Sequence, residues 1–386
     1  MHDIKLKNTY YFLTNHNFTL SVRLSVNFMK LKYFILSKLS YNRVTCAYVR
    51  KKIKTLREVQ DKVAERKEMM QHIEKNRALS WYQTMVTIRD FENIIDDKNR
   101  AGCLYGTTHL YNGQEAIATA VCDLLSPDDL ILSTHRNHGH AIAKGTKTYP
   151  MFAEIFGKKT GTNGGHGGSM HISDISVGNF GGNGIVGGNY PVALGLAQAL
   201  KMDGSERIVV CFSGDGSTNE GTFHESLNLA SIWRLPIIFV VENNQYAMSS
   251  DASVMIAGSI SERAKNYEMS AYQVDGQDVF AVHDVFKQAR QDVKSGPVLI
   301  EAVTYRFKGH SRSDSEQYRT PDEFFNWEDP IKKLREVLIA DYDVSSEEIA
   351  LIDERIYRHL SAEAEQALTD EEASMPSDSW KAVYSD

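Results

Sequence analysis

Two short, continuous runs of apolar residues in the middle of the chain predict buried β-strands. Residues 208–212 and 237–241 carry only apolar side chains, which is typical of strands covered on both faces. Residues 222–234, between these runs, follow the helical period and stop before Pro236. A strand, a helix and a strand in this order pair their strands in parallel. The pattern therefore predicts an α/β fold with a mainly parallel sheet flanked by helices.

The remaining pattern extends this organisation in both directions along the chain. Apolar residues at helical spacing predict a helix over residues 78–99, and the charged stretch 58–77 before it is typical of a solvated helix. The other expected elements are helices at 190–202 and 279–294, strands at 272–274 and 297–303, and glycine-rich loops at 161–168 and 181–188.

Charge divides the chain more sharply than hydropathy does. The chain has 386 residues and a net charge of −7, but residues 1–57 hold 12 Lys and Arg against the single acid Asp3. We therefore expect three parts: a basic, poorly ordered extension over residues 1–57, an α/β domain over 58–340, and a helical C-terminal tail over 341–386. The acidic body after residue 57 argues against nucleic acid as a partner, because binding phosphates needs a basic face.

Composition narrows the class of protein further. Hydrophobic residues make up 42% and charged residues 24% of the chain, which excludes a disordered or fibrous protein. No apolar run approaches the length of a transmembrane helix, so we expect no membrane partner. The four cysteines are scattered and are interpreted as reduced thiols, which favours the cytoplasm. The basic extension leaves two alternatives: an organelle matrix, if it is a transit peptide, or a start of the protein at Met69 or Met70.

Polar residues follow both central strands at the same edge of the predicted sheet. Asp215 comes after the first strand, and Asn243 and Asn244 follow the second. Since neighbouring parallel strands end at one edge, about 4.8 Å apart, these side chains are expected to converge. Their oxygen atoms suit Mg²⁺ or Ca²⁺, and the amides of a helix opening after Asp215 would favour a phosphate. A divalent cation that bridges a diphosphate fits both; in the alternative, Asp215 and Asn219 only cap the helix.

The spacing of these residues resembles a known cofactor motif. Gly214-Asp215-Gly216, 26 residues and then Asn243-Asn244 is similar to the thiamine diphosphate motif. With its surroundings it resembles the alpha subunits of the thiamine-dependent first component of 2-oxo acid and acetoin dehydrogenase complexes. The resemblance covers residues 66–340, and its other stretches lie in the expected order at residues 108–115, 134–140, 167–171, 182–187 and 305–314.

The resemblance implies thiamine diphosphate and Mg²⁺ as cofactors and assigns the residues that hold them. Asp215, Asn244 and the carbonyl of Tyr246 would bind the metal. The residues assigned to the diphosphate are Gly216 and Ser217, through their amides, and His135 and Arg136 from the other side.

The resemblance also implies which residues meet the reacting part of the cofactor. Gly184 and Val186 would lie under its central bend. His109 and His310 would face the reacting carbon, where histidines can stabilise an oxyanion and transfer protons. His138 and His140 are expected to stabilise a loop instead.

The implied activity is that of a thiamine diphosphate-dependent oxidoreductase with a lipoyl acceptor. Pyruvate is the first candidate substrate, acetoin the second and branched-chain 2-oxo acids the third. The implied partners are a beta subunit, in an assembly of two alpha and two beta chains, and a lipoyl-bearing acyltransferase. A cofactor-binding subunit that has lost turnover and a stand-alone thiamine lyase remain as alternatives.

Two other motifs compete with this interpretation. Residues 182–187 also match GxGxxG, but the segment before them lacks the buried strand that a dinucleotide site needs. Five histidines between His135 and His171 could suggest zinc, but their spacing is not that of a zinc protease.

Overall fold

The computed structural model describes residues 72–104 and 106–374. All of them lie in the second of two compact units, Met69–Asp386. The predicted basic extension and most of the helix expected over residues 58–77 fall outside the described residues. No helix in the described ranges is both long and apolar enough to cross a membrane.

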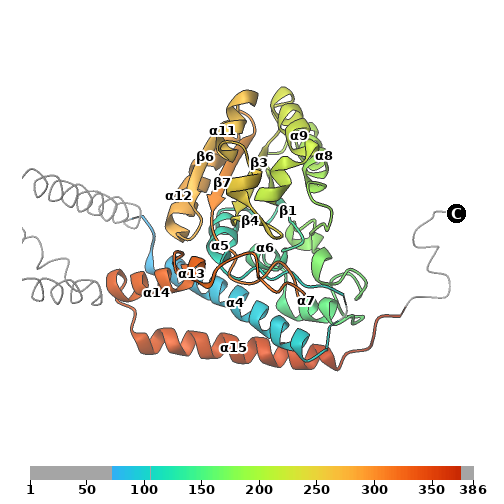
Figure 1. Ribbon diagram of the computed structural model, residues 1–386, viewed down its shortest axis with the longest axis vertical. Coiled ribbons are helices and arrows are strands. Elements are labelled where there is room, and N and C mark those ends of the chain that lie inside the picture. Colours follow the sequence, from blue (N-terminus) through green and yellow to red (C-terminus); the bar gives the residue numbers. More distant parts are fainter. Residues whose placement is uncertain (1–71, 105, 375–386) are drawn as a thin grey trace, which may run out of the picture. The chain divides into compact units, whose positions relative to one another are not determined.

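A five-stranded sheet forms the centre of this unit (Figure 1). Its strand order is β1-β2-β3-β7-β6, and every neighbouring pair is parallel. This confirms the predicted α/β fold with a mainly parallel sheet. The strands are β1 (Leu130–Leu132), β2 (Val209–Gly214), β3 (Ile237–Asn243), β6 (Ser270–Asp275) and β7 (Val298–Val303).

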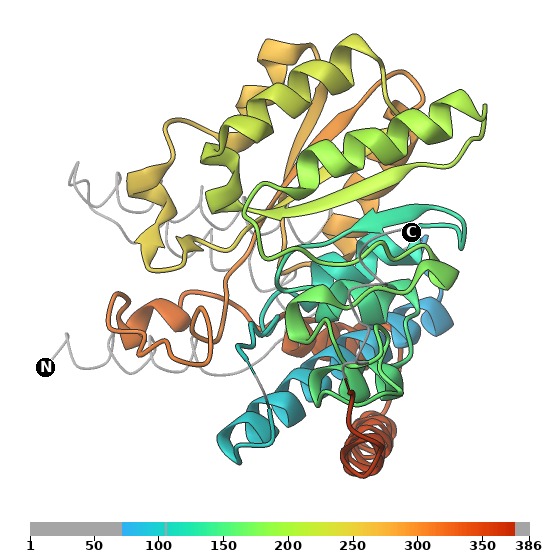
Figure 2. The same ribbon diagram turned by 90° about the vertical axis from the view of Figure 1, so that its right-hand side faces the viewer.

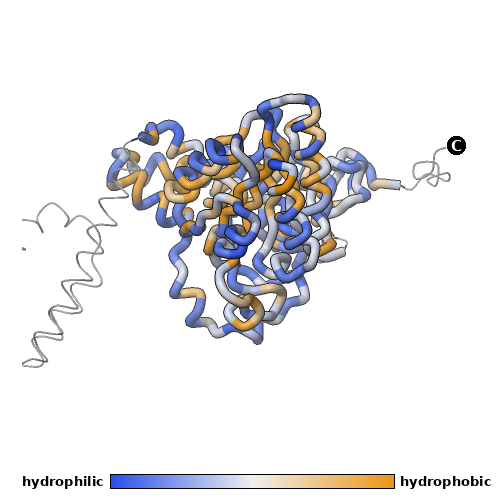
Figure 3. Tube along the Cα trace, turned by 90° about the horizontal axis from the view of Figure 1, so that it is seen from above, coloured by the Kyte–Doolittle hydropathy of each residue, from blue (hydrophilic) through white to orange (hydrophobic). Residues whose placement is uncertain are grey.

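Alternation along the two central strands explains why both faces of the sheet are buried. Val210 and Phe212 of β2 pack on one face, together with helices α4 (Lys75–Arg100), α5 (Glu115–Asp123) and α12 (Val279–Asp292). Val209 and Cys211 point to the opposite face, which is covered by α8 (Asn189–Met202) and α9 (Gly221–Ile232). Figures 2 and 3 show this layering, with the apolar segments gathered in the interior.

A second helical layer lies below the sheet. Helix α15 (Ser346–Leu368) runs beside α4 although the two are far apart in the sequence (Figure 1). Leu360 and Ala364 of α15 are buried with Phe91 of α4 and with residues of α7 (Thr148–Ile155). The end of the described chain is thus part of the core.

The remaining elements are mostly short. They are α6 (His138–Lys144), α10 (Ala252–Met255), α11 (Ile260–Arg263), α13 (Pro321–Phe324), α14 (Pro330–Asp341), the 3-10 helices η1 (Ser169–His171), η2 (Ile175–Val177), η3 (Asp215–Asn219) and η4 (Ala264–Tyr267), and the strands β4 (Tyr246–Ala247) and β5 (Ser250–Asp251).

The predicted elements from residue 190 onward agree with the structure to within a few residues. The largest region without a predicted element is residues 115–155, where the structure contains β1 and the helices α5, α6 and α7. β1 has only three residues, and α6 is rich in His and Gly. Such elements are held by tertiary packing, which leaves little local signal.

Candidate active site at the carboxyl edge of the sheet

A cavity of about 330 Å³ opens where the central strands end. β2 and β3 pair in register up to Gly214 and Glu242, so Asp215 follows directly beside the end of β3. The predicted site residues that line the cavity are His135, Arg136, Val186, Asp215, Gly216, Ser217, Asn244, Tyr246 and His310. Two predicted residues, His109 and Gly184, do not line it. The position is the one at which open parallel sheets bind their ligands.

Asp215 places a buried carboxyl group in this cavity. The residue is 2% exposed, and its Oδ2 has no hydrogen-bond partner among the described residues. Burial raises the pKa of its carboxyl group to about 6. A buried carboxylate oxygen beside the amide of Asn244 and the carbonyl of Tyr246 is a donor set that fits a hard divalent cation.

Two buried arginines, Arg136 and Arg306, bring positive charge to the same cavity. Arg136 donates to the carbonyls of Leu110 and His310, both at 2.8 Å, and Arg306 donates to those of Tyr246 and Met248 at 3.3 and 3.0 Å. Neither guanidinium bonds a carboxylate within the described residues. Burial, followed by the charge of Arg306, lowers the pKa of Arg136 to about 9. The two guanidinium groups therefore favour an anion in the cavity.

The turn after Asp215 differs in one detail from the sequence-based prediction. The expected helix does not open directly after Asp215, because the 3-10 helix η3 intervenes and α9 begins only at Gly221. A Cβ at Gly216 would lie 2.5 Å from the Cβ of Ala247, so the close approach of these two turns requires glycine. Ser217 is fixed by bonds to the Gly214 carbonyl and to the Tyr190 hydroxyl, at 2.6 and 2.7 Å.

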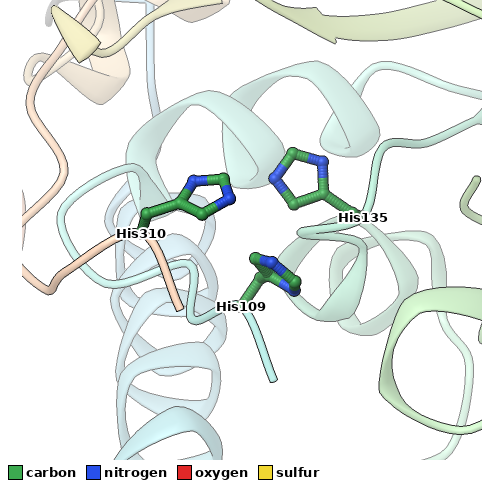
Figure 4. A group of neighbouring side chains, drawn as sticks. All are labelled: His109, His135 and His310. Atoms are coloured by element: carbon green, nitrogen blue, oxygen red, sulfur yellow. The ribbon is translucent and has the colours of Figure 1, made fainter. Parts of the chain in front are cut away.

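Three histidines lie close together, and two of them, His135 and His310, line the cavity (Figure 4). The ring of His109 lies 4.7 Å from that of His135 and 4.9 Å from that of His310, between ring centres. His109 Nδ1 and His135 Nε2 are buried without a partner within the described residues. Burial, then the charge of Arg136, lowers the pKa of all three, to about 3, 2 and 4 for His109, His135 and His310. They are neutral imidazoles at neutral pH.

These three histidines differ from the set that suggested zinc in the sequence. They are the one group of three possible metal ligands in the part of the chain that the structure describes. Arg136 Nη2 lies 3.2 Å from His310 Nδ1 and places a positive charge beside them. The cluster is therefore a poor site for a second cation.

His310 is held by the loop that follows β7. Its backbone N–H donates to the Asp314 carboxylate at 2.6 Å, and Asp314 also accepts from the Tyr318 hydroxyl at 2.6 Å. Tyr318 in turn accepts from Arg306 at 2.7 Å. The loop that carries His310 is thus linked to a cavity arginine.

Comparison with known proteins identifies the family of this chain. The family model described as "Dehydrogenase E1 component" matches residues 83–375. The chain belongs to this family. Its membership implies dependence on thiamine diphosphate, and relatives named as alpha subunits imply a beta-subunit partner.

Relatives of two named activities resemble this E1 chain to similar degrees. The chain is 42% identical to the alpha subunit of acetoin:2,6-dichlorophenolindophenol oxidoreductase from Bacillus subtilis, with 79% of this chain and 92% of the relative covered. It is 40% identical to the pyruvate dehydrogenase E1 component subunit alpha of Porphyra purpurea, over 78% and 91%. A second acetoin oxidoreductase alpha subunit, from Cupriavidus necator, is 44% identical over 65% and 76%.

The two predicted residues outside the cavity lining lie next to residues that do line it. His109 contacts the rings of His135 and His310, as described above. Gly184 lies between Asn183 and Ile185, both of which line the cavity, and is itself exposed. Val186 is 53% exposed and forms part of the apolar rim of the E1 cavity.

Several residues of the E1 site were not predicted from the sequence. Arg306, Tyr190 and Glu242 line the cavity but carried no predicted role. Arg306 lies within residues 305–314, which resemble the family, so this resemblance could have indicated a role for it in the site. Glu242 directly precedes the paired asparagines and could have been found in the same way.

Proposed function

We propose that this E1 chain is the alpha subunit of a pyruvate dehydrogenase component that uses thiamine diphosphate and Mg²⁺ and transfers the acyl group to lipoyl groups. The observation that carries the proposal is the presence of opposite buried charges in one cavity without a direct ion pair between them. Among the described residues, no cation bonds the Asp215 carboxylate, and no carboxylate bonds Arg136 or Arg306. A Mg²⁺–diphosphate group satisfies both charges at once.

The residues present fit such a group. Asp215, Asn244 and the Tyr246 carbonyl would hold the metal, and the amides of Gly216 and Ser217 would meet the diphosphate from the side of the sheet. His135 and Arg136 would approach it from the other side. When bound, thiamine diphosphate supplies the electron sink for cleaving a carbon–carbon bond beside a carbonyl.

The neutral histidines His109 and His310 are the side chains of this subunit that would act on the substrate. Because Arg136 and burial hold the pKa of His109 and His310 far below neutrality, each presents an uncharged imidazole. A neutral imidazole can donate an N–H to an oxyanion and accept a proton elsewhere on the ring. We infer that these two residues orient and stabilise the substrate oxygen, with the Asp314 carboxylate holding His310 in place.

The partner is inferred from the apolar rim of the cavity. Ile185, Val186 and Met248 are 71%, 53% and 62% exposed, although the cavity beside them is built from buried polar groups. Exposed apolar side chains around a site favour a second surface that covers them. We propose that a beta subunit does so, in an assembly of two alpha and two beta chains that serves a lipoyl-bearing acyltransferase.

Acetoin is the second candidate substrate. The identities to the two acetoin oxidoreductase alpha subunits, 42% and 44%, are slightly above the 40% to the Porphyra subunit. The segment around His138 and His140 also favours the acetoin type. We propose a cytoplasmic location, because the three described cysteines are free thiols.

The function is tested by assaying the full chain together with its beta subunit. We expect 2,6-dichlorophenolindophenol reduction that requires thiamine diphosphate, Mg²⁺ and either pyruvate or acetoin, and the ratio of the two kcat/KM values identifies the substrate. Asp215→Ala should abolish the Mg²⁺-dependent binding of thiamine diphosphate, measured by calorimetry. Asp128→Asn, at an exposed acid remote from the cavity lining, is the control. Unchanged cofactor affinity in a folded Asp215→Ala protein would refute the metal assignment.

A further inference from the structure

A fully buried glutamine lies behind the cavity and contacts a proposed metal ligand. Gln114 is 0% exposed and is not part of the cavity lining, whereas Asn244 is. Gln114 Oε1 accepts a hydrogen bond from Asn244 Nδ2 at 3.1 Å. Gln114 Nε2 has no hydrogen-bond partner among the described residues, so the contact with Asn244 is the side-chain hydrogen bond that links Gln114 to the cavity.

This contact fixes the orientation of the Asn244 side-chain amide, which decides whether its oxygen can bind a cation. A side-chain amide carries an oxygen, which can bind a cation, and an NH₂ group, which cannot. A rotation of half a turn exchanges the two. By accepting from Nδ2, Gln114 keeps the NH₂ group away from the cavity. The Tyr246 N–H also donates to Asn244 Oδ1, but at 3.4 Å this hydrogen bond is too long to hold the amide by itself.

Gln114 is itself held by rigid neighbours on both sides. A Cβ at Gly113, where φ is +98°, would lie 2.4 Å from the Tyr305 carbonyl oxygen, so the backbone approaches the end of β7 as only glycine permits. The carboxylate of Glu115 accepts from the Gly113 N–H at 3.0 Å and from Arg89 at 2.5 Å. The Gln114 N–H donates to the Tyr111 carbonyl at 3.2 Å. These contacts therefore fix the backbone position of Gln114.

We propose that Gln114 is a positioning residue that orients the carbonyl oxygen of Asn244 toward the divalent cation. The inference rests on the proposed function, because it takes Asn244 as a ligand of Mg²⁺. A residue that orients a metal ligand in this way commonly changes metal affinity about 10-fold to 100-fold when it is replaced. For this role Gln114 touches neither cofactor nor substrate.

The test compares two substitutions of Gln114 in two backgrounds. Gln114→Met keeps the length of the side chain but removes the acceptor, and Gln114→Glu keeps an acceptor for Asn244. Each is made in the native chain and in Asn244→Asp, whose two carboxylate oxygens leave no wrong orientation. The readout is the Mg²⁺ concentration that half-saturates thiamine diphosphate binding by the full chain with its beta subunit.

We expect Gln114→Met to raise that concentration at least about 10-fold in the native background. In the Asn244→Asp background the same change should cost less than roughly 3-fold, because orientation no longer matters. Gln114→Glu should stay within roughly 3-fold of the native value. Equal losses from Gln114→Met in both backgrounds would mean that Gln114 only fills space, and the proposal would fail. An equally weak Gln114→Glu variant would also overturn it.

Failure of the proposed function gives a different result. In that case the native protein would show no Mg²⁺-dependent binding of thiamine diphosphate, or Asn244→Ala would leave the half-saturating concentration unchanged. The Gln114 variants test the inference only if cofactor binding depends on Mg²⁺ and Asn244→Ala weakens it. A failure of the proposed function can therefore be told apart from a failure of the Gln114 inference.

Discussion

Two groups of histidines lie close together in this molecule and are built in opposite ways. The rings of His109, His135 and His310 have no carboxylate partner in the described structure, and they face or adjoin the cavity. His138 and His140 of α6 are fully buried, and each bonds a buried glutamate: His138 Nδ1 lies 2.9 Å from Glu92, and His140 Nε2 lies 3.0 Å from Glu242.

The buried pair belongs to a closed network. His138 also meets the Ser169 hydroxyl at 3.0 Å, and His140 meets that of Ser133 at 2.7 Å. Tyr111 joins the two halves, because its N–H donates to Glu92 and its hydroxyl donates to Glu242. Tyr111 is two residues from His109, so this network fixes the backbone that carries a cavity histidine.

The difference separates groups that serve the fold from groups that serve a ligand. A buried polar group without a partner costs stability, and folded proteins retain such groups chiefly where function needs them. Paired groups offset that cost through their hydrogen bonds. We therefore expect substitutions in the cavity set to change activity and substitutions in the paired set to change stability.

The largest expected effect is on turnover. His109→Gln and His310→Gln should each lower kcat by about 10²-fold to 10⁴-fold, because positioned imidazoles contribute that much to proton transfer and charge stabilisation. The free energy of unfolding should change by less than about 1 kcal/mol, since neither ring has a carboxylate partner to lose. Steady-state kinetics and chemical denaturation of the same preparations measure both. A large stability loss at full activity would reverse the assignment.

The paired set should respond in the opposite way. Glu92→Gln breaks the bond network that joins His138 and the Tyr111 N–H, and should lower the free energy of unfolding by about 3 kcal/mol. Activity per folded molecule should fall far less than in the His310 variant. Denaturant titration gives the loss, and active-site titration with the cofactor counts the competent molecules. His224→Gln, at an exposed histidine of α9, is the control.

A carboxylate in the cavity should behave unlike Glu92. The folded pKa of Asp215, about 6, lies above the unfolded value of about 3.8, so its ionised form costs stability above pH 6. Asp215→Asn should therefore stabilise the cofactor-free protein at pH 7.5 by roughly 3 kcal/mol. The gain should shrink as the pH falls below 6 and vanish near pH 3.8. Unfolding titrations at pH 7.5 and 4.5 test this, and a gain that does not depend on pH would contradict desolvation of the carboxylate as its cause.

The sequence predicted the sheet and its ligand edge because both rest on local signals. The runs 208–212 and 237–241 are apolar throughout, and Asp215 and Asn244 follow them closely, so their convergence depended only on parallel pairing. The partners of the histidines could not be predicted. Glu92 lies 46 residues from His138, and Glu242 lies 102 residues from His140, so only the packing of α4, α6 and β3 brings them together.

The same reason explains what was missed in the cavity. Arg306 reaches the carbonyls of Tyr246 and Met248, about 60 residues away in the chain, and Gln114 reaches Asn244 from 130 residues away. Their roles depend on side-chain direction at the ends of β3 and β7. The periodicity of the sequence does not predict the direction of these side chains.

The smallest expected effect is a change in the slope of stability with pH. The folded pKa of His109, about 3, lies below its unfolded value of about 6.5, because burial and Arg136 disfavour the charged ring. The histidine therefore contributes stability that is fully present above pH 6.5 and is lost as the pH falls toward 3, since the unfolded chain binds a proton that the folded chain does not. In His109→Asn this loss should disappear. The free energy of unfolding should then fall less steeply between pH 6.5 and 4, by up to about 1.4 kcal/mol per pH unit. Denaturant titrations at half-unit steps, without cofactor, measure the two slopes. Parallel curves would show that His109 binds protons equally in the folded and the unfolded chain, and the proposed difference between the cavity histidines and the paired ones would then be wrong.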